Sequence, residues 1–136
     1  MVLISIIITI IDIKIYRIPD VLLVLLLVFL ISSDFLKGYS FVLNGLLSAA
    51  IVFIIFFAIF YFIGSMGFGD VKYAAVLSYG LGLKSMYIAV VTAAISGLLL
   101  FFVGYLFWGW NRKTKLPFAP LLSIGVIFSI ILKMRF

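Results

Sequence analysis

Long apolar runs, separated by short clusters of charged and small residues, fill the 136-residue sequence. A helix that spans a bilayer needs about 20 apolar residues, with a range of about 17–25. Six segments approach this length: the N-terminus to Tyr16, Ile18 to Ser33, Phe41 to Ile63, Asp70 to Leu83, Ser85 to Gly109, and Leu116 to Leu132. Helices satisfy their own backbone hydrogen bonds in lipid, and no alternation with a period of two favours a barrel. We therefore predict an all-α integral membrane protein, a six-transmembrane-helix bundle, with neighbouring helices shielding the short fourth segment.

Composition supports a membrane environment and narrows the chemistry. Hydrophobic residues make up 68% of the chain and charged residues 10%, whereas a soluble domain has about 25% charged residues. We expect a single domain, residues 1–136, in contact with a lipid bilayer. The chain has no cysteine and no histidine, which removes thiolate zinc sites, cysteine nucleophiles and the usual general base. Serine and zinc intramembrane proteases that need histidine are excluded with them, and we expect no cofactor and no metal.

The basic residues indicate an orientation rather than a nucleic-acid partner. The net charge is +6, but the lysines and arginines lie at the ends of apolar segments and form no patch for nucleic acid. Six flank the first, third and fifth connections: Lys14, Arg17, Lys72, Arg112, Lys113 and Lys115. Four lie on the opposite side: Lys37, Lys84, Lys133 and Arg135. The positive-inside rule then makes the first group cytoplasmic, which puts Asp12 and Asp70 at the same depth near the cytoplasmic face.

Two of the four acidic residues stand out because of their apolar surroundings. Asp12 lies within an isoleucine-rich run, and Asp70 ends the sequence Gly67-Phe68-Gly69-Asp70. A carboxylate at membrane depth is costly, so each is a candidate functional group. Two carboxylates that share a proton can activate water for peptide hydrolysis without histidine, cysteine or metal. Gly67 and Gly69 would let a substrate backbone approach closely and would permit positive-φ geometry.

Structural roles remain open for the same residues. Asp70 could cap the N-terminus of the fourth segment, and Asp12 could pair with Lys14, Arg17 or Lys72. The two lysines could favour an ionised carboxylate or contact an acidic substrate residue, or they could simply snorkel at helix ends.

The other two acidic residues have simpler interpretations. Asp20 follows Pro19 and is expected to be the N-cap of the second segment, while Asp34 is expected to be solvated in a loop. Small residues four positions apart, such as Gly45 with Ala49 and Ala93 with Gly97, predict close packing of helices within the bundle.

Three motifs in order resemble those of the type IV prepilin peptidases. The stretch from Asp12 to Asp20, ending Ile18-Pro19-Asp20, resembles their first aspartate motif, and Gly67-Phe68-Gly69-Asp70-Val71-Lys72 resembles their GxGDxK motif. Pro117-Phe118-Ala119-Pro120 resembles a further Pro-Phe-Gly-Pro element, with Ala119 in place of the usual glycine. The resemblance implies a GxGD intramembrane aspartyl protease. Its catalytic pair would be Asp12 and Asp70, with supporting motif residues Gly67, Gly69, Lys72, Lys14 and Pro19.

The resemblance also implies a substrate and a location. The substrate would be a prepilin-like precursor (pilin, pseudopilin or archaellin), cut after a glycine at the cytoplasmic edge of its hydrophobic stretch. The protein would be a multi-pass protein of the cytoplasmic membrane of a prokaryote. Many bacterial members also carry a cysteine-containing zinc region and N-methyltransferase activity. This chain lacks cysteine and resembles the short, peptidase-only forms, so we expect cleavage without methylation.

Two other functions compete with this prediction. Proteases of the presenilin and signal-peptide-peptidase type share GxGD, but they use a larger bundle and a Pro-Ala-Leu motif, whereas this chain has Ala119-Pro120-Leu121. A non-enzymatic alternative is a small membrane transporter or assembly subunit. Such a protein would use Asp12 and Asp70 for proton relay or helix pairing.

Overall fold

The structure is a computed structural model that describes residues 2–15, 18–64, 66–109 and 118–135. These residues form helices and short connections, with no strand among them, which confirms the all-α prediction. The helices are α1 (Val2–Ile15), α2 (Asp20–Phe35), α3 (Tyr39–Ile63), α4 (Phe68–Leu81), α5 (Leu83–Trp108) and α6 (Phe118–Arg135). Several residues used above lie outside the described residues: Tyr16, Arg17, Arg112, Lys113, Lys115, Leu116 and Pro117.

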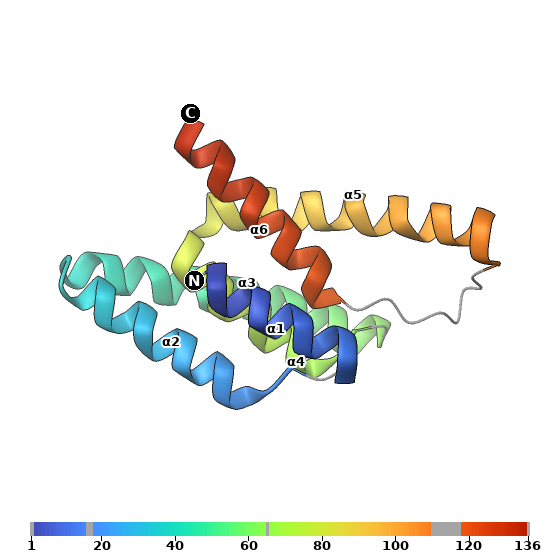
Figure 1. Cartoon of the computed structure of the whole chain (residues 1–136). Coiled ribbons are helices and arrows are strands. Elements are labelled where there is room, and N and C mark those ends of the chain that lie inside the picture. Colours follow the sequence, from blue (N-terminus) through green and yellow to red (C-terminus); the bar gives the residue numbers. More distant parts are fainter. Residues whose placement is uncertain (1, 16–17, 65, 110–117, 136) are drawn as a thin grey trace.

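Helix α4 lies at the centre of the fold, although its sequence is the least apolar of the six. It packs most extensively along α3, and it also contacts α2, α5 and α6 (Figure 1). Helix α3 ends at Gly64, which is in the left-handed conformation. Glycines also mark both ends of α4, since Gly67 is its N-cap and Gly82, with a positive φ, is its C-cap. Nine of its fourteen residues are buried, which confirms that neighbouring helices shield this short segment.

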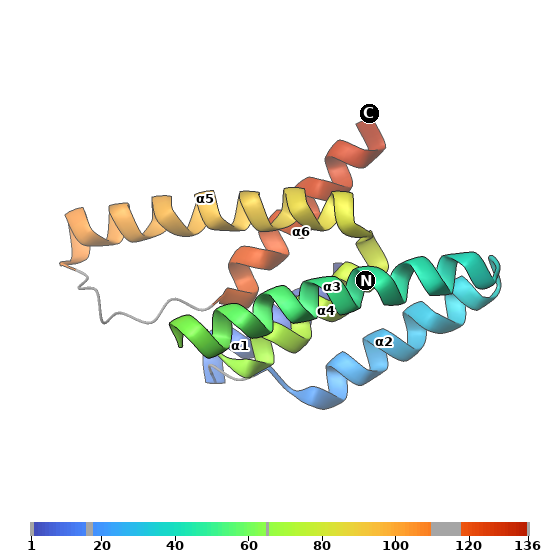
Figure 2. The same cartoon turned by 180° about the vertical axis from the view of Figure 1, so that it is seen from behind.

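The second close pair is formed by α5 and α6, which cross in both views (Figure 2). Their backbones meet at Gly125 of α6, where an added Cβ would collide with the backbone of Ala89 in α5. The first helix, α1, packs mainly on α6 and to a smaller extent on α2. Helix α6 therefore connects the N-terminal helix to the central helix.

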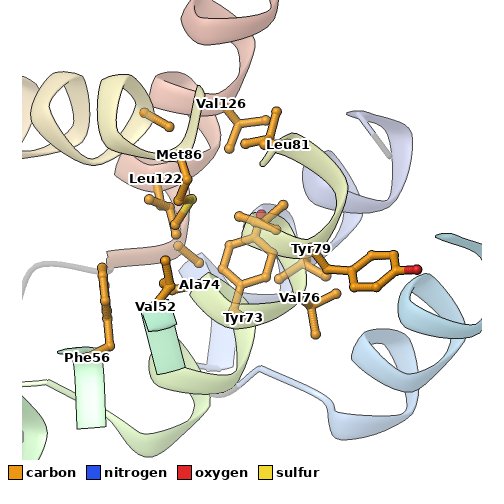
Figure 3. Packing of buried hydrophobic residues seen from close by; sticks show 14 of the residues in the cluster. Val52, Phe56, Tyr73, Ala74, Val76, Tyr79, Leu81, Met86, Leu122 and Val126 are labelled. Carbon is orange, nitrogen blue, oxygen red and sulfur yellow. The ribbon is translucent and has the colours of Figure 1, made fainter. Parts of the chain in front are cut away.

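The small residues noted in the sequence allow the expected close packing. A Cβ on Gly45 would lie 2.8 Å from the ring of Tyr79, and one on Gly97 would lie 3.0 Å from Leu121 Cδ1. Around α4, buried apolar side chains from several helices form one core, which includes Val52, Phe56, Tyr73, Met86, Leu122 and Val126 (Figure 3). The contacts of Gly45 and Gly97 confirm the predicted packing within the bundle.

Within the described residues, three helices, rather than six, are long and apolar enough to cross a membrane by themselves. These are α3, α5 and α6, with 25, 26 and 18 residues. Helices α1, α2 and α4 have 14, 16 and 14 residues, which is short of the roughly 20 residues that a span requires. The prediction that six helices each span the membrane thus overestimated the length of three of them. An apolar run in the sequence includes residues that the chain uses to turn between helices.

Candidate active site

Asp12 lies near the C-terminal end of α1, and its side chain is buried, with 5% of the residue exposed. The backbone N–H of Ala119, in the first turn of α6, donates a hydrogen bond to its carboxylate. The N–H groups in the first turn of a helix have no partner within the helix, so they are available to an acceptor of this kind. Asp12 Oδ2 is buried without a hydrogen-bond partner among the described residues. The Asp12 carboxylate therefore accepts a hydrogen bond from Ala119 and has one oxygen, Oδ2, that accepts none from the described residues.

Asp70 is the third residue of α4 and does cap this helix. Its Oδ2 accepts a hydrogen bond of 3.3 Å from the N–H of Gly67, and its own N–H donates to the Gly67 carbonyl oxygen at 3.1 Å. An acidic side chain at the third helical position satisfies the first free donor in this way. The capping role considered from the sequence is therefore present. It uses Oδ2 and fixes the orientation of the carboxylate.

The two aspartates line one pocket of about 310 Å³. Their carboxylates are near enough to interact electrostatically, although 58 positions separate them in the sequence. The pocket is lined by Asp12, Ile18, Asp20, Gly67, Phe68, Gly69, Asp70 and Lys72. The structure thus brings together both predicted catalytic residues and three of the five supporting motif residues.

Lys72 forms an ion pair with Asp20 and with neither candidate catalytic residue. Its Nζ lies 3.0 Å and 3.1 Å from the two carboxylate oxygens of Asp20, and 5.0 Å from the centre of the Phe68 ring. Asp20 is the first residue of α2 rather than its N-cap, which is Pro19, so the capping prediction for Asp20 was wrong. Lys14 is exposed and does not line the pocket. Among the described residues, then, no lysine pairs with Asp12.

The glycines of the motif act through their small size rather than through an unusual backbone. Gly67 is the N-cap of α4 in an extended conformation, with φ −76° and ψ 147°, and Gly69 is helical. Neither glycine therefore adopts the positive-φ geometry that its lack of a side chain would permit. A Cβ on Gly69 would lie 3.5 Å from Ile18 Cβ, inside the pocket wall. Pro19 directs the chain into α2 immediately after Ile18 and does not itself line the pocket.

Asp34 differs from its predicted solvated state. Its Oδ1 accepts a hydrogen bond of 2.9 Å from Lys37 Nζ, and its side chain is only 16% exposed. Asp34 lies in the last turn of α2 and Lys37 just beyond it, and neither residue lines the pocket. Asp34 therefore has a local structural role.

Sequence comparison assigns the chain to a family. The sequence profile of the type IV leader peptidase family matches residues 1–102. The chain belongs to this family. The match includes Asp12, Asp70 and the other pocket residues of this leader peptidase family member.

Two curated relatives extend the comparison. The prepilin leader peptidase/N-methyltransferase of Pectobacterium carotovorum subsp. carotovorum is 32% identical over 136 residues, covering 93% of this chain and 47% of the relative. The protein of the same name from Bacillus subtilis (strain 168) is 32% identical over 126 residues, covering 91% of this chain and 50% of the relative. The chain thus spans about half the length of these relatives. No solved structure matches it with statistical significance.

Nowhere in residues 2–15, 18–64, 66–109 and 118–135 do three or more histidine, cysteine, aspartate or glutamate side chains gather in a group that could hold a metal ion. The pocket instead combines carboxylates with one lysine and apolar walls. Its groups suit proton transfer between carboxyl groups and a bound water.

Sequence reasoning missed the hydroxyl groups behind the pocket. Tyr73 and Ser123 are buried and hydrogen-bonded to each other at 2.8 Å, and Thr9 contacts Ser123 at 2.7 Å. A helical signal was present, since Thr9 lies three residues before Asp12 and Tyr73 three residues after Asp70. Within apolar runs, however, a single threonine or tyrosine is indistinguishable from ordinary core until its partners are known.

Proposed function

We propose that this chain is an intramembrane aspartyl endopeptidase that removes the leader peptide of prepilin-like precursors. The observation that carries the proposal is the shared pocket of Asp12 and Asp70, two carboxylates from separate helices. Family membership supports the reaction class, because the relatives in Pectobacterium and Bacillus are named prepilin leader peptidases. The substrate would be a pilin, pseudopilin or archaellin precursor.

In the proposed reaction, the two carboxyl groups share one proton. The ionised group takes a proton from water while the water oxygen forms a bond to the scissile carbonyl carbon. The neutral group gives its proton to the carbonyl oxygen, so a tetrahedral diol forms. The carboxyl group that took the proton from water then gives it to the amide nitrogen, and the C–N bond breaks. As the carbonyl re-forms, one diol hydroxyl passes its proton to the other carboxylate, so the pair again holds one proton. When two carboxyl groups share a proton in this way, their apparent pKa values belong to the pair rather than to either residue.

We also propose that all six helices lie in the cytoplasmic membrane of a prokaryote, with the pocket near the cytoplasmic face. Helix α4 is about 21 Å long at 1.5 Å per residue, so it would be embedded among longer helices rather than cross a core of about 30 Å alone. Large exposed apolar side chains on α1 and α2 support contact with lipid: Leu3, Ile7, Ile10, Val24 and Val28. The positive-inside rule supports the cytoplasmic placement.

Methylation is a separate question. The relatives are named for both leader peptidase and N-methyltransferase activity, and the chain spans about half of their length. Because the chain contains no cysteine, our prediction for it is cleavage without methylation of the new N-terminus. Mass spectrometry of the cleaved product, incubated with S-adenosylmethionine, would contradict this prediction if it found the added methyl group.

The deciding experiment is a cleavage assay in membranes with a pilin-like substrate. Asp12→Asn and Asp70→Asn are suitable variants, because the asparagine oxygen can still accept the backbone hydrogen bonds from Ala119 and Gly67. Each should lower the cleavage rate by at least about 100-fold, the usual contribution of a proton-transferring group. Each variant should remain inserted in the membrane at wild-type abundance.

Asp34→Asn is the matched control. It removes a carboxylate of the same type from an ion pair at the end of α2, and should leave cleavage unchanged. Wild-type cleavage by either Asp12→Asn or Asp70→Asn would refute the proposed pair. Absence of cleavage by wild type, with proton transport that depends on the same aspartates, would favour the transporter alternative.

A further inference from the structure

Four hydroxyl-bearing residues, of which three are buried and Thr9 is partly buried, form a cluster next to the pocket. Ser5 and Thr9 come from α1, Tyr73 from α4 and Ser123 from α6. Tyr73 is 0% exposed, Ser5 2% and Ser123 4%, and none of the four lines the pocket. We call these residues the hydroxyl cluster. Because they are shielded from the pocket, a contact with substrate does not account for them.

Hydrogen bonds connect the three helices through this cluster. The Thr9 hydroxyl lies 2.8 Å from the Ser5 carbonyl oxygen, which can only accept a hydrogen bond, and 2.7 Å from Ser123 Oγ. Ser123 Oγ lies 2.8 Å from the Tyr73 hydroxyl, and either group can donate. The Tyr73 hydroxyl is also within hydrogen-bonding reach of the Ser5 side chain. Since a buried hydroxyl without a partner is costly, these contacts hold the helices in one arrangement.

Each helix places its cluster residue about one turn from a group of the site. Thr9 precedes Asp12 by three residues on α1, and Tyr73 follows Asp70 by three residues on α4. Residues three or four apart share a helix face. On α6, Ser123 follows Ala119 by four residues, and the N–H of Ala119 donates a hydrogen bond to Asp12. A shift of any one helix in the cluster would thus move a group of the site by a similar amount.

The two aspartate-bearing helices share little packing of their own. In the described part of the chain, α1 and α4 are not among the closely packed helix pairs, and each packs against α6 and α2. The distance between Asp12 and Asp70 is therefore set by packing on these two helices and by the hydroxyl cluster, in which Tyr73 of α4 reaches toward Ser5 of α1. Hydrogen bonds have narrower distance and angle limits than apolar contacts, so a polar cluster fixes this distance more closely than side-chain packing alone.

We propose that the hydroxyl cluster, centred on Tyr73 and Ser123, is a positioning element that fixes the separation of Asp12 and Asp70. Tyr73 acts through Asp70, Thr9 through Asp12, and Ser123 through the first turn of α6. The inference rests on the proposed protease function for its kinetic consequence. Its geometric consequence, a defined spacing of α1 and α4, is independent of any substrate.

The same helix provides a matched control. Tyr79 is also buried on α4, 3% exposed, but its hydroxyl has no hydrogen-bond partner among the described residues. Figure 3 shows the two tyrosine rings leaving α4 in different directions: the Tyr73 ring lies among the core side chains, and the Tyr79 ring points away from Tyr73. Tyr73→Phe and Tyr79→Phe therefore make the same chemical change, and only the first breaks the cluster.

The kinetic test compares kcat and KM for cleavage of a pilin-like substrate. Misplacement of reacting groups by about 1 Å can cost about 100-fold in rate, so Tyr73→Phe should lower kcat by about 10- to 100-fold and leave KM within about twofold. Tyr79→Phe should match wild type. Thr9→Val, which keeps the shape but loses the hydroxyl, should repeat the loss, and Thr9→Ser should restore most of it. Wild-type kcat in both Tyr73→Phe and Thr9→Val would overturn the proposal.

The geometric test measures the spacing of α1 and α4 directly. The chain has no cysteine, so Lys14→Cys on α1 and Phe68→Cys on α4, both exposed, can carry spin labels for pulsed distance measurement. We expect Tyr73→Phe to broaden the distance distribution and Tyr79→Phe to leave it unchanged. An unchanged distribution in Tyr73→Phe would overturn the proposal. If wild type failed to cleave any pilin-like substrate, the protease function would fail, and this measurement would still decide the positioning role.

Discussion

The contact between α5 and α6 at Gly125 offers a test of how the site is held. A Cβ at this position would collide with the carbonyl carbon and oxygen of Ala89, which belong to the backbone of α5. A backbone group cannot rotate away, so Gly125→Ala must push the two helices apart. Helix α6 carries Ser123 two residues earlier and the Ala119 N–H that bonds Asp12. The substitution therefore affects both stability and the site.

The expected magnitude combines two opposing terms. Alanine in a helix interior is favoured over glycine by about 0.5–1 kcal/mol. Overpacking of a close contact costs about 1–3 kcal/mol, and a backbone obstacle belongs at the upper end of that range. We expect Gly125→Ala to lower the free energy of unfolding by about 2 kcal/mol after the helix gain is subtracted. It should also reduce cleavage.

Gly97→Ala is the control on the facing helix. Its Cβ would lie 3.0 Å from Leu121 Cδ1, the end of a flexible side chain that can move. Its free energy of unfolding should stay within about 0.5 kcal/mol of wild type, because the helix gain offsets a small rearrangement. Unfolding of both variants by sodium dodecyl sulfate in mixed micelles, followed by circular dichroism, measures the difference. Equal stability of Gly125→Ala and Gly97→Ala would refute the reasoning.

Two further predictions concern the pocket itself. Lys72→Met removes the ion pair with Asp20, whose two side chains are partly exposed, Lys72 at 37% and Asp20 at 65%. The free energy of unfolding should therefore change by less than about 1 kcal/mol in the same assay. A larger loss of stability would mean that the ion pair has a structural role. Gly69→Ala adds a methyl group at ordinary contact distance from Ile18, so stability should be retained while cleavage falls through loss of pocket space; unfolding of this variant would contradict the described geometry.

The sequence predicted the helices, because long apolar runs indicate helices in lipid. It also predicted that Asp12, at the end of α1, and Asp70, at the start of α4, lie on the same side of the fold, and the two residues line one pocket. That prediction used only an alternating direction of successive helices. The depth of the pair in a membrane stays a prediction.

Tertiary contacts account for what the sequence did not predict. Asp20 was expected to cap α2, but its partner, Lys72, lies 52 residues away, and nothing local identifies it. Tyr73 sits in an apolar run and looks like core until Ser123 is placed beside it. The positive-φ positions also depend on where helices end, and they occur at turns such as Gly64 and Gly82 rather than in the GxGD motif.

The contacts of the two aspartates explain why backbone donors, rather than lysines, would suit the proton-sharing pair that we propose. Each carboxylate accepts a backbone N–H, Asp70 from Gly67 and Asp12 from Ala119, and each donor lies at the N-terminus of a helix. Such donors orient an oxygen while carrying only a partial charge. A lysine in direct contact would add a full positive charge and favour ionisation of both carboxylates, which would remove the shared proton. Because Lys72 is bonded to Asp20, its charge is matched outside the pair, and the orientation of the pair is left to the helix ends and the hydroxyl cluster.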